Sequence, residues 1–405
     1  MRVCVVGSGG REHALAVALA RTAEVVVTPG NPGIPGSVAA PPEDLSADLY
    51  VIGPEVPLVE GLADRLRAGG ALVFGPGRDG AQLEASKAWM KDVLVTAGLA
   101  TAAHRAFGAD EVDAALAFLR TLPGLYVVKT DGLAAGKGVL VTDSLSEADD
   151  DVRAKLSGTS FGDAGRRVVI EEGMSGPEVS LLCLCDGHRV VPLASAQDYK
   201  RISDGDEGPN TGGMGAYSPV PSVDAAEAER LTELLVAPTL HELRRRGIDY
   251  RGVLYAGLML TPDGPKVLEY NVRFGDPETQ VVLPRWTGDV TAILAACAAG
   301  SLKVQPTFSS DAAVTVVCAS EGYPVAPRTG DRIEGMDAAA ARPSVDVYCA
   351  GVAASDGALV TAGGRVLDVT ALGPTVAEAR SRAYAAVADL SWPGLHVRTD
   401  IAASL

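Results

Sequence analysis

Short apolar runs alternate with helix-forming stretches at the start of the chain. Val3–Val6, Val25–Thr28, Leu49–Ile52 and Ala71–Phe74 each have the length and composition of a buried strand. Alternation of strands with helices is typical of a parallel sheet covered by helices. We therefore predict an α/β fold that begins with an N-terminal parallel α/β domain over residues 1–80.

The pattern changes after this first unit. Residues 81–305 combine strands, a helix expected at Gln82–Ala97 and a long polar segment, Gln197–Pro221, so we predict a central α+β domain. A loop of that length inside a compact domain is usually functional. Residues 306–405 hold further strands, a hairpin turn expected at Gly363-Gly364 and one helix, which predicts a small C-terminal α+β domain.

The composition narrows the class of protein. The net charge of −16 disfavours a nucleic-acid partner, because phosphate repels an acidic chain. Hydrophobic residues make up 47% of the sequence, yet no apolar run approaches the length of a membrane-spanning helix. The six cysteines lie mostly in apolar runs and are expected to be buried and reduced. The chain starts directly with a strand and has no signal peptide, so we expect a cytoplasmic protein, and a monomer.

The segment Lys266–Gln280 opens as a strand and closes as a polar turn. Side chains alternate across a strand, so Glu269, Asn271 and Arg273 point to one face. Carboxylate and amide oxygens are ligands suited to Mg²⁺, and a planar guanidinium suits a carboxylate or phosphate. A metal site beside a guanidinium that can bind an anion predicts chemistry on a nucleotide and a carboxylic acid. The alternative is a half-exposed edge strand with a surface ion pair.

The loop Gly7–Gly10 lies between an expected strand and an expected helix. Backbone amides at such a turn point at an anion, and the helix dipole favours phosphate. A dinucleotide fold would require glycine where Glu12 stands and an acid where Thr28 stands. The loop therefore predicts binding of a phosphate or sugar phosphate rather than NAD, with a tight turn that binds nothing as the alternative.

A glycine-rich loop from Lys129 to Gly138 joins two expected strands. It fails the Walker pattern, because Asp131 stands at the first required glycine and Gly138 follows Lys137 in place of Ser or Thr. A mobile hairpin lid over ATP explains the loop better, and a flexible hairpin without a ligand is the alternative.

Two more segments carry groups suited to a nucleotide or an anion. Val168–Glu178 is expected to run strand, turn, strand, and such a backbone can read adenine while a carboxylate holds the ribose hydroxyls. Asp198–Arg201 opens the long polar segment, where Lys200 suits anion binding in an acidic protein. An acidic turn and a solvated loop are the respective alternatives.

Together these segments resemble the glycinamide ribonucleotide synthetases, also called phosphoribosylamine–glycine ligases, of the ATP-grasp superfamily. The resemblance implies a central ATP-grasp domain with a mobile lid at about residues 110–180. The similar segments follow the family order over almost the whole chain: Gly7–Leu15, Gly53–Leu58, Gln82–Lys87, Asp131–Gly138, Gly208–Tyr217 and Asn271–Glu278. The ending Trp392–Ile401 also resembles that of the family.

The resemblance also implies roles for individual residues. Lys129, Lys200 and Arg273 would be catalytic, and Glu269 and Asn271 would bind Mg²⁺ or Mn²⁺. ATP would be bound by Lys87, Lys129, Gly132, Lys137, Gly138, Glu171, Glu172 and Glu178. Substrates would be bound by Gly9, Gly10, Glu12, Asp198, Lys200, Asn210, Gly212 and Arg273. The preceding strand, Val253–Leu260, holds no acid, so phosphate oxygens and water would complete the metal shell.

The implied activity is that of an ATP-dependent carbon–nitrogen ligase in purine biosynthesis. Transfer of the ATP γ-phosphate to glycine would make glycyl phosphate, which the amine of 5-phosphoribosylamine would attack to give glycinamide ribonucleotide, ADP and phosphate. Another ATP-grasp carboxylate–amine ligase is the first alternative. An NAD-dependent oxidoreductase and a nucleotide-binding regulatory module without turnover are the others.

Overall fold

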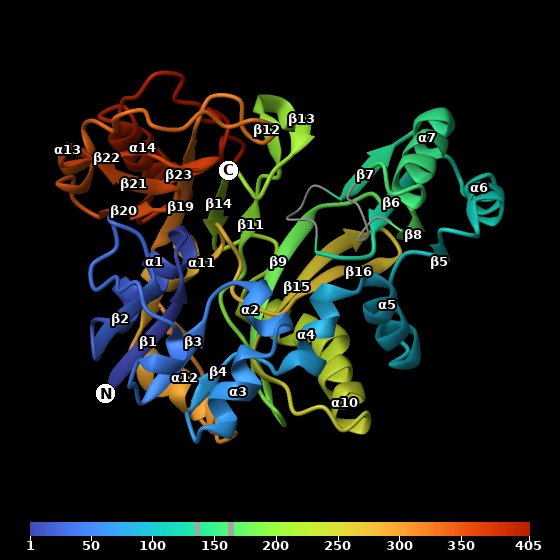
Figure 1. Cartoon of the computed structure of the whole chain (residues 1–405), viewed down its shortest axis with the longest axis horizontal. Helices are drawn as coiled ribbons and strands as arrows, with labels where there is room; N and C mark the ends of the chain where they lie inside the picture. The colour runs from blue at the N-terminus through green and yellow to red at the C-terminus, as the bar shows by residue number, and fades with distance from the viewer. Residues whose placement is uncertain (134–137, 161–165) are drawn as a thin grey trace.

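The N-terminal sheet is parallel throughout, as the alternation of strands and helices predicts. The computed structural model describes residues 1–133, 138–160 and 166–405. The strand order is β2-β1-β3-β4, with helices on both faces (Figure 1). The strands are β1 (Arg2–Gly7), β2 (Glu24–Pro29), β3 (Leu49–Ile52) and β4 (Val73–Phe74). The helices are α1 (Gly10–Leu19), α2 (Glu55–Val59) and α3 (Leu62–Ala68).

The single helix expected at Gln82–Ala97 is wrong. The structure has two helices there, α4 (Arg78–Ala85) and α5 (Lys87–Thr96). Ser86 lies between them in an extended conformation, φ −132° and ψ 111°, and its hydroxyl accepts a hydrogen bond from the Trp89 amide as the N-cap of α5. The break makes Lys87 the first residue of a helix.

The central region contains two antiparallel sheets. One has the order β10-β9-β15-β16 and the other, which we call the lid sheet, has the order β5-β8-β6-β7. The first is built from β9 (Glu178–Asp186), β10 (Val190–Pro192), β15 (Arg251–Thr261) and β16 (Gly264–Asn271). The lid sheet is built from β5 (His104–Gly108), β6 (Tyr126–Thr130), β7 (Val139–Thr142) and β8 (Arg167–Glu172). The expected strand–turn–strand at Val168–Glu178 therefore connects two different sheets.

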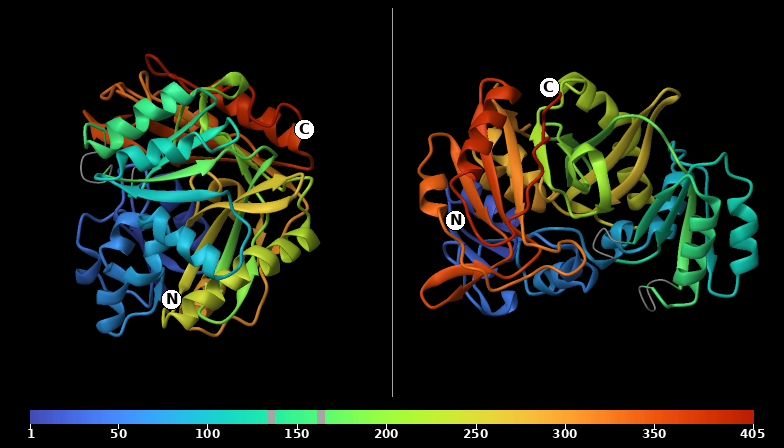
Figure 2. Two further views of the ribbon diagram at one scale, coloured as in Figure 1. Left: turned by 90° about the vertical axis from the view of Figure 1, so that its right-hand side faces the viewer. Right: turned by 90° about the horizontal axis from the view of Figure 1, so that it is seen from above.

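The lid sheet has a hydrophobic core of its own. Helices α6 (Val112–Leu119) and α7 (Leu145–Leu156) cover it, and buried residues such as Phe107, Leu116 and Ile170 pack between them. Figure 2 shows this unit standing apart from the other domains on one side of the molecule. A separate core allows the unit to move as one body relative to the rest of the chain.

The C-terminal sheet takes strands from the long polar segment. Its order is β11-β14-β19-β23-β20. The strands are β11 (Gln197–Asp198), β14 (Gly215–Ser218), β19 (Ala312–Ala319), β20 (Val345–Cys349) and β23 (Arg365–Gly373), and α13 (Met336–Ala340) and α14 (Val376–Val387) accompany them. Between β11 and β14 lies a hairpin of β12 (Arg201–Ser203) and β13 (Glu207–Asn210). The polar segment is thus anchored at both ends by the sheet.

The hairpin turn expected at Gly363-Gly364 is wrong. β22 (Ala358–Thr361) pairs with β21 (Val352–Ser355), whereas β23 pairs with β19 and β20. The glycines instead allow a close crossing of backbones, because a Cβ on Gly351 would lie 2.7 Å from the Cα of Gly363.

Two hydrophobic cores join the three regions. One contains residues of the N-terminal sheet together with β9, β15 and α12 (Val290–Ala298), and the other extends from the central sheet into the C-terminal domain. The remaining elements are α9 (Ala225–Leu231), α10 (Ala237–Arg245), α11 (Thr279–Val282), β17 (Trp286–Thr287) and β18 (Thr307–Phe308). No helix in the described part of the chain is long and apolar enough to cross a membrane. All six cysteines are buried and free.

Candidate active site

Glu269 and Asn271 end β16 on one face of the central sheet. Burial raises the pKa of Glu269, but the charges of Lys129, Lys200 and Lys87 lower it by more, so the carboxylate is ionised. No hydrogen bond reaches this carboxylate from any other residue that the structure describes. An ionised carboxylate that keeps its oxygens free beside an amide oxygen fits a hard divalent cation. Within the same residues, no group of three or more His, Cys, Asp or Glu is arranged for a metal.

Three lysines from separate parts of the chain surround that carboxylate: Lys87, Lys129 and Lys200. Lys87 begins α5 and donates to the Gly132 carbonyl at 3.0 Å, in the loop after β6. Lys129 is the last residue but one of β6 and donates to the Leu268 carbonyl at 3.3 Å. Burial lowers the pKa of Lys87, against the opposing effect of Glu269. Three positive charges around one carboxylate form a cradle for the phosphates of a nucleotide.

Glu171 lies beneath this cradle in a buried ion-pair network. Lys91 Nζ is 2.9 Å from Glu171 Oε2, Lys129 Nζ is 3.0 Å from Oε1, and the side chains are 1–7% exposed. Burial raises the pKa of Glu171, but Lys129 and Lys91 lower it by more. The sequence reading missed Lys91, although it stands four residues after Lys87 on α5 and so on the same helical face. The side chain of Glu171 therefore orients two lysines, and its backbone pairs with β5 and β6 inside the lid sheet.

Lys200 joins two carboxylates of the predicted site. It is hydrogen-bonded to Glu178, the expected ribose ligand, and lies 3.6 Å from Asp198. Burial lowers the pKa of Lys200, but Asp198 and Glu178 raise it well above the usual value. Burial raises the pKa of Asp198 to about 7, against the attraction of Lys200. The structure thus brings an ATP contact and two substrate contacts of the prediction into one cluster.

Arg273 is held by two carboxylates that the sequence reading missed. Its Nη2 lies 2.9 Å from Glu84 of α4, and its Nε lies 3.4 Å from Glu55 of α2. The same Nη2 donates to Asn271 at 3.2 Å, which orients the amide oxygen of the metal pair. The sequence could have pointed to both carboxylates. Glu55 lies within Gly53–Leu58 and Glu84 within Gln82–Lys87, two of the segments that carry the family resemblance.

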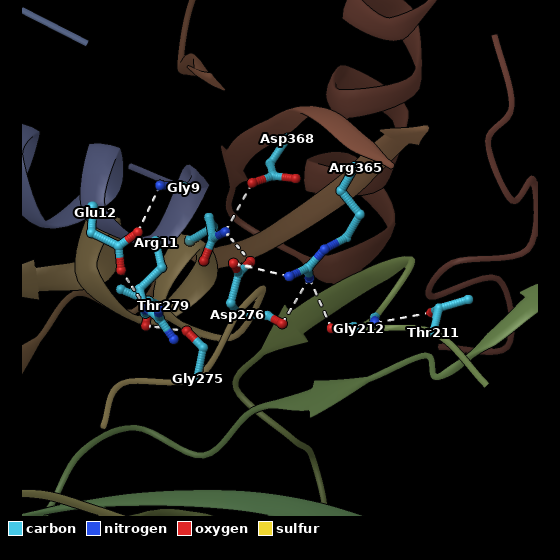
Figure 3. Close-up of polar contacts among 12 residues, drawn as sticks. Gly9, Arg11, Glu12, Thr211, Gly212, Gly275, Asp276, Thr279, Arg365 and Asp368 are labelled. Carbon is cyan, nitrogen blue, oxygen red and sulfur yellow. Dashed lines mark hydrogen bonds and ion pairs between the residues drawn. The ribbon is translucent and has the colours of Figure 1, made fainter. Parts of the chain in front are cut away.

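The turn before α1 is occupied by a side chain of its own helix. Gly9 donates its amide to Glu12 Oε2 at 2.7 Å, and Arg11 donates to Glu12 Oε1 at 2.5 Å (Figure 3). A Cβ on Gly7 or Gly53 would lie 2.4 or 2.1 Å from Glu12 atoms, so both glycines make room for this carboxylate. Glu12 therefore shapes the turn in a way that a third glycine of the dinucleotide pattern could not.

A second cluster connects this turn to the C-terminal domain. Arg365 donates to the Gly212 carbonyl at 2.8 Å and lies 3.0 Å from Asp276 Oδ2 (Figure 3). Gln280 donates to Asp276 at 2.8 Å and to Asp368 at 2.9 Å. Burial and the nearby Asp276 raise the pKa of Asp368 to about 7. Asp276 and Gln280 lie in the segment Lys266–Gln280, but nothing in the sequence pointed to Arg365 or Asp368.

The remaining predicted residues lie around these clusters or outside the described chain. Asn210 ends β13, opposite Arg201. Glu172 accepts the Ala103 amide at 3.0 Å, beside the connection between the lid sheet and the central sheet. Gly138 is buried and directly precedes β7. Lys137 lies outside the described residues.

The same architecture occurs in known proteins. Three family models match in sequence order: phosphoribosylglycinamide synthetase N domain (residues 1–84), ATP-grasp (A) domain (85–279) and C domain (313–404). The phosphoribosylamine–glycine ligase of Streptomyces coelicolor is 48% identical over 100% of this chain and 99% of its own. That of Caulobacter vibrioides is 47% identical, over 99% of this chain and 97% of its own.

A crystal structure of the same enzyme from Thermotoga maritima superposes with a TM-score of 0.84 at 34% identity, covering 99% of this chain and 100% of that one. The biotin carboxylase domain of Hydrogenobacter thermophilus 2-oxoglutarate carboxylase shares the fold, with a TM-score of 0.74 at 16% identity over 98% of this chain and 91% of that one.

Proposed function

The chain belongs to the phosphoribosylglycinamide synthetase family of ATP-dependent ligases, and we propose that it joins glycine to 5-phosphoribosylamine. The products would be glycinamide ribonucleotide, ADP and phosphate, a step of purine biosynthesis. Its partners would be these small molecules, and we propose that it acts as a monomer in the cytoplasm.

The observation that carries this proposal is the ionised Glu269 within a ring of lysines. A carboxylate is a poor electrophile toward an amine at neutral pH, so it must first be activated by phosphoryl transfer. That transfer spreads negative charge over the phosphoryl oxygens, and fixed cations stabilise it. Lys87, Lys129 and Lys200 come from separate elements and converge near one carboxylate, which is the arrangement that phosphoryl transfer needs.

Glu269 and Asn271 would hold a divalent cation, Mg²⁺ or Mn²⁺. Bound there, the cation would neutralise phosphate charge as the phosphoryl group moves. Arg273 supports this assignment, because its hydrogen bond fixes the side-chain oxygen of Asn271. With one carboxylate and one amide oxygen from the protein, water and phosphate oxygens would complete the shell.

The other residues would bind and orient the reactants. Lys129, fixed by Glu171 at 3.0 Å, would contact the phosphates of ATP, and Glu178 the ribose hydroxyls. Lys200 and Asp198 would flank the glycine. Arg273 would bind the glycine carboxylate in competition with its present partner Glu84. Water must be excluded because glycyl phosphate hydrolyses, and the lid sheet with the loop after Lys129 would be the cover.

The turn Gly7–Gly10 would bind the phosphate of the amine substrate. The Gly9 amide already donates a hydrogen bond to Glu12, so the following amides at the start of α1 would donate to the phosphate. Asp276 lies close to this turn, since a Cβ on Gly9 would be 3.8 Å from the Oδ2 of Asp276.

Omission of each substrate in turn tests the proposal. ADP release should require both glycine and 5-phosphoribosylamine, and replacing glycine by alanine or serine should abolish it. ADP release with a different acid or amine would instead identify another ATP-grasp ligase. Glycine labelled with ¹⁸O in its carboxylate should yield labelled inorganic phosphate, because the oxygen bridging carbon and phosphorus comes from glycine. Unlabelled phosphate under full turnover would exclude the acyl phosphate route.

A further inference from the structure

The last residues of the chain lie against the β12–β13 hairpin, which leads into Asn210 and Gly212 of the proposed substrate site (Figure 1). We call residues 396–402 the C-terminal tail. His396 and Ala319 exchange two backbone hydrogen bonds, of 2.8 and 2.9 Å, which join the tail to the end of β19. Beyond that bridge the tail crosses from the C-terminal domain to the hairpin.

Arg398 is the centre of this contact, and only 1% of its side chain is exposed. Nε and Nη2 donate to the two oxygens of Asp400, at 2.8 and 2.7 Å. Nη1 donates to the Arg201 carbonyl and to Asp206 Oδ1, both at 3.1 Å. A buried guanidinium whose nitrogens are all engaged holds its neighbours in one geometry, because displacing a partner leaves buried charge uncompensated.

The tail also fixes the turn of the hairpin. Thr399 donates its amide to Asp204 Oδ1 at 2.7 Å, and Gly205 donates its amide to Asp400 Oδ2 at 2.9 Å. Asp206 has a φ of 60°, a left-handed conformation that is uncommon outside glycine. Its carboxylate is one of the two that the buried Arg398 guanidinium holds, so the tail supports a backbone conformation that is unfavourable for a residue other than glycine.

The same guanidinium packs on the segment that carries two proposed substrate ligands. Arg398 Cζ lies 5.0 Å from the centre of the Tyr199 ring, and Ala402 donates its amide to the Tyr199 hydroxyl at 2.9 Å. Tyr199 stands between Asp198 and Lys200, and side chains alternate along extended backbone. The tail therefore packs on one side of this segment while Asp198 and Lys200 face the other, toward Glu178.

We infer that Arg398 is a positioning residue for the ligase reaction, acting through Tyr199 and the hairpin to hold Asp198 and Lys200 against the substrates. The inference rests on the proposed function. Its physical basis is that a charged group must be positioned accurately to act on a reacting phosphate. A displacement of about 1 Å can lower the rate on the order of 10²-fold.

Arg398→Met keeps the aliphatic stem and removes the guanidinium. We expect the glycine KM to rise and kcat to fall, each on the order of tenfold, while the ATP KM changes less than about threefold. Arg342→Met is the control for loss of an arginine–aspartate pair as such, at a side chain that is 41% exposed. It removes a similar two-contact pair in the same domain, with Nη2 2.9 Å from Asp389, and that pair does not touch the hairpin. An unchanged glycine KM in folded Arg398→Met, whatever its loss of thermal stability, would overturn the inference.

Asp204→Ala is a second variant that does not put folding at risk, because Asp204 is exposed. It removes the acceptor of Thr399 and should raise the glycine KM in the same direction, about threefold. If Arg398→Met does not fold, an unchanged glycine KM in Asp204→Ala overturns the inference. The two failures are distinguishable: wild-type protein without glycine-dependent ADP release overturns the proposed function, whereas active wild type with unaffected variants overturns only the positioning role.

Discussion

Arg273 Nη2 lies 2.9 Å from Glu84 Oε1, which ties the segment after β16 to α4. Both side chains are largely buried, with 16% and 10% exposed. Burial raises the pKa of Glu84, and Arg273 opposes that effect. Glu84 also accepts the Val272 amide at 2.8 Å, so the pair fixes both the backbone and the guanidinium beside the metal pair. The orientation of Asn271 therefore depends on a contact between residues 189 positions apart.

Arg273→Lys should raise the glycine KM on the order of tenfold and leave the ATP KM within about twofold, because lysine keeps the charge but loses the planar fork. Steady-state kinetics with each substrate varied would measure both values. Arg246→Lys is the matched control, since Arg246 also joins two carboxylates, Glu242 at 2.7 Å and Asp92 at 2.9 Å, but outside the site. Equal changes in both KM values would indicate a general structural role for Arg273.

Glu269→Gln should reduce kcat/KM by at least roughly 10²-fold, the size expected when a main electrostatic contribution to the transition state is removed. The shape is retained, so thermal unfolding should change little. The cation concentration for half-maximal activity should also rise, and a Mg²⁺ titration of activity would measure it. Near-normal turnover at saturating Mg²⁺ would remove Glu269 from the site.

Gly9→Val should raise the KM of the amine substrate steeply and leave ATP affinity close to normal. Its Cβ would lie 3.0 Å from Glu12 Oε2 and 3.8 Å from Asp276 Oδ2, so the side chain would fill the space at the start of α1. ATP affinity is measured by direct titration. Val17→Ala, at an exposed position of α1 away from the turn, is the control and should have little effect. Loss of ATP affinity with an unchanged amine KM would mean that the two sites are assigned in reverse.

His13→Asn should remove part of the acid sensitivity of the fold. Burial lowers the pKa of His13 to about 4, and its Nδ1 accepts the Cys349 amide at 2.8 Å. Because the unfolded value is near 6.5, the unfolded chain binds more protons between pH 6.5 and 4, and stability falls as the pH falls through that range. The loss should approach about 3 kcal/mol at the acid end.

Asparagine can still accept the Cys349 amide but does not titrate. Urea unfolding of wild type and His13→Asn from pH 7 to 4 measures the difference. His396→Asn is the control, because it makes the same change at a half-buried histidine outside the His13–Cys349 contact. Parallel curves for wild type and His13→Asn would contradict the assignment.

The elements that local pattern specifies were predicted well. The parallel N-terminal strands, the strands on either side of the glycine-rich loop and the strand that carries Glu269 and Asn271 follow from hydrophobic periodicity. The placement of Glu269 and Asn271 on one face of that strand followed from the alternation of side chains, and their role as metal ligands stays a prediction. The break between α4 and α5 was missed. It depends on one side chain, because the Ser86 hydroxyl caps the start of α5.

The sequence by itself determined which segments become strands and helices, which of them carry lysines and carboxylates, and the family to which they belong. Only the tertiary structure decided that Lys91 pairs with Glu171, that Glu84 holds Arg273 and that Arg398 reaches the β12–β13 hairpin. The physical reason is that periodicity records which face of an element is buried, whereas a buried charge selects its partner by proximity after the chain has folded. Such pairs join positions 80, 189 and 197 residues apart, and no local pattern spans those separations.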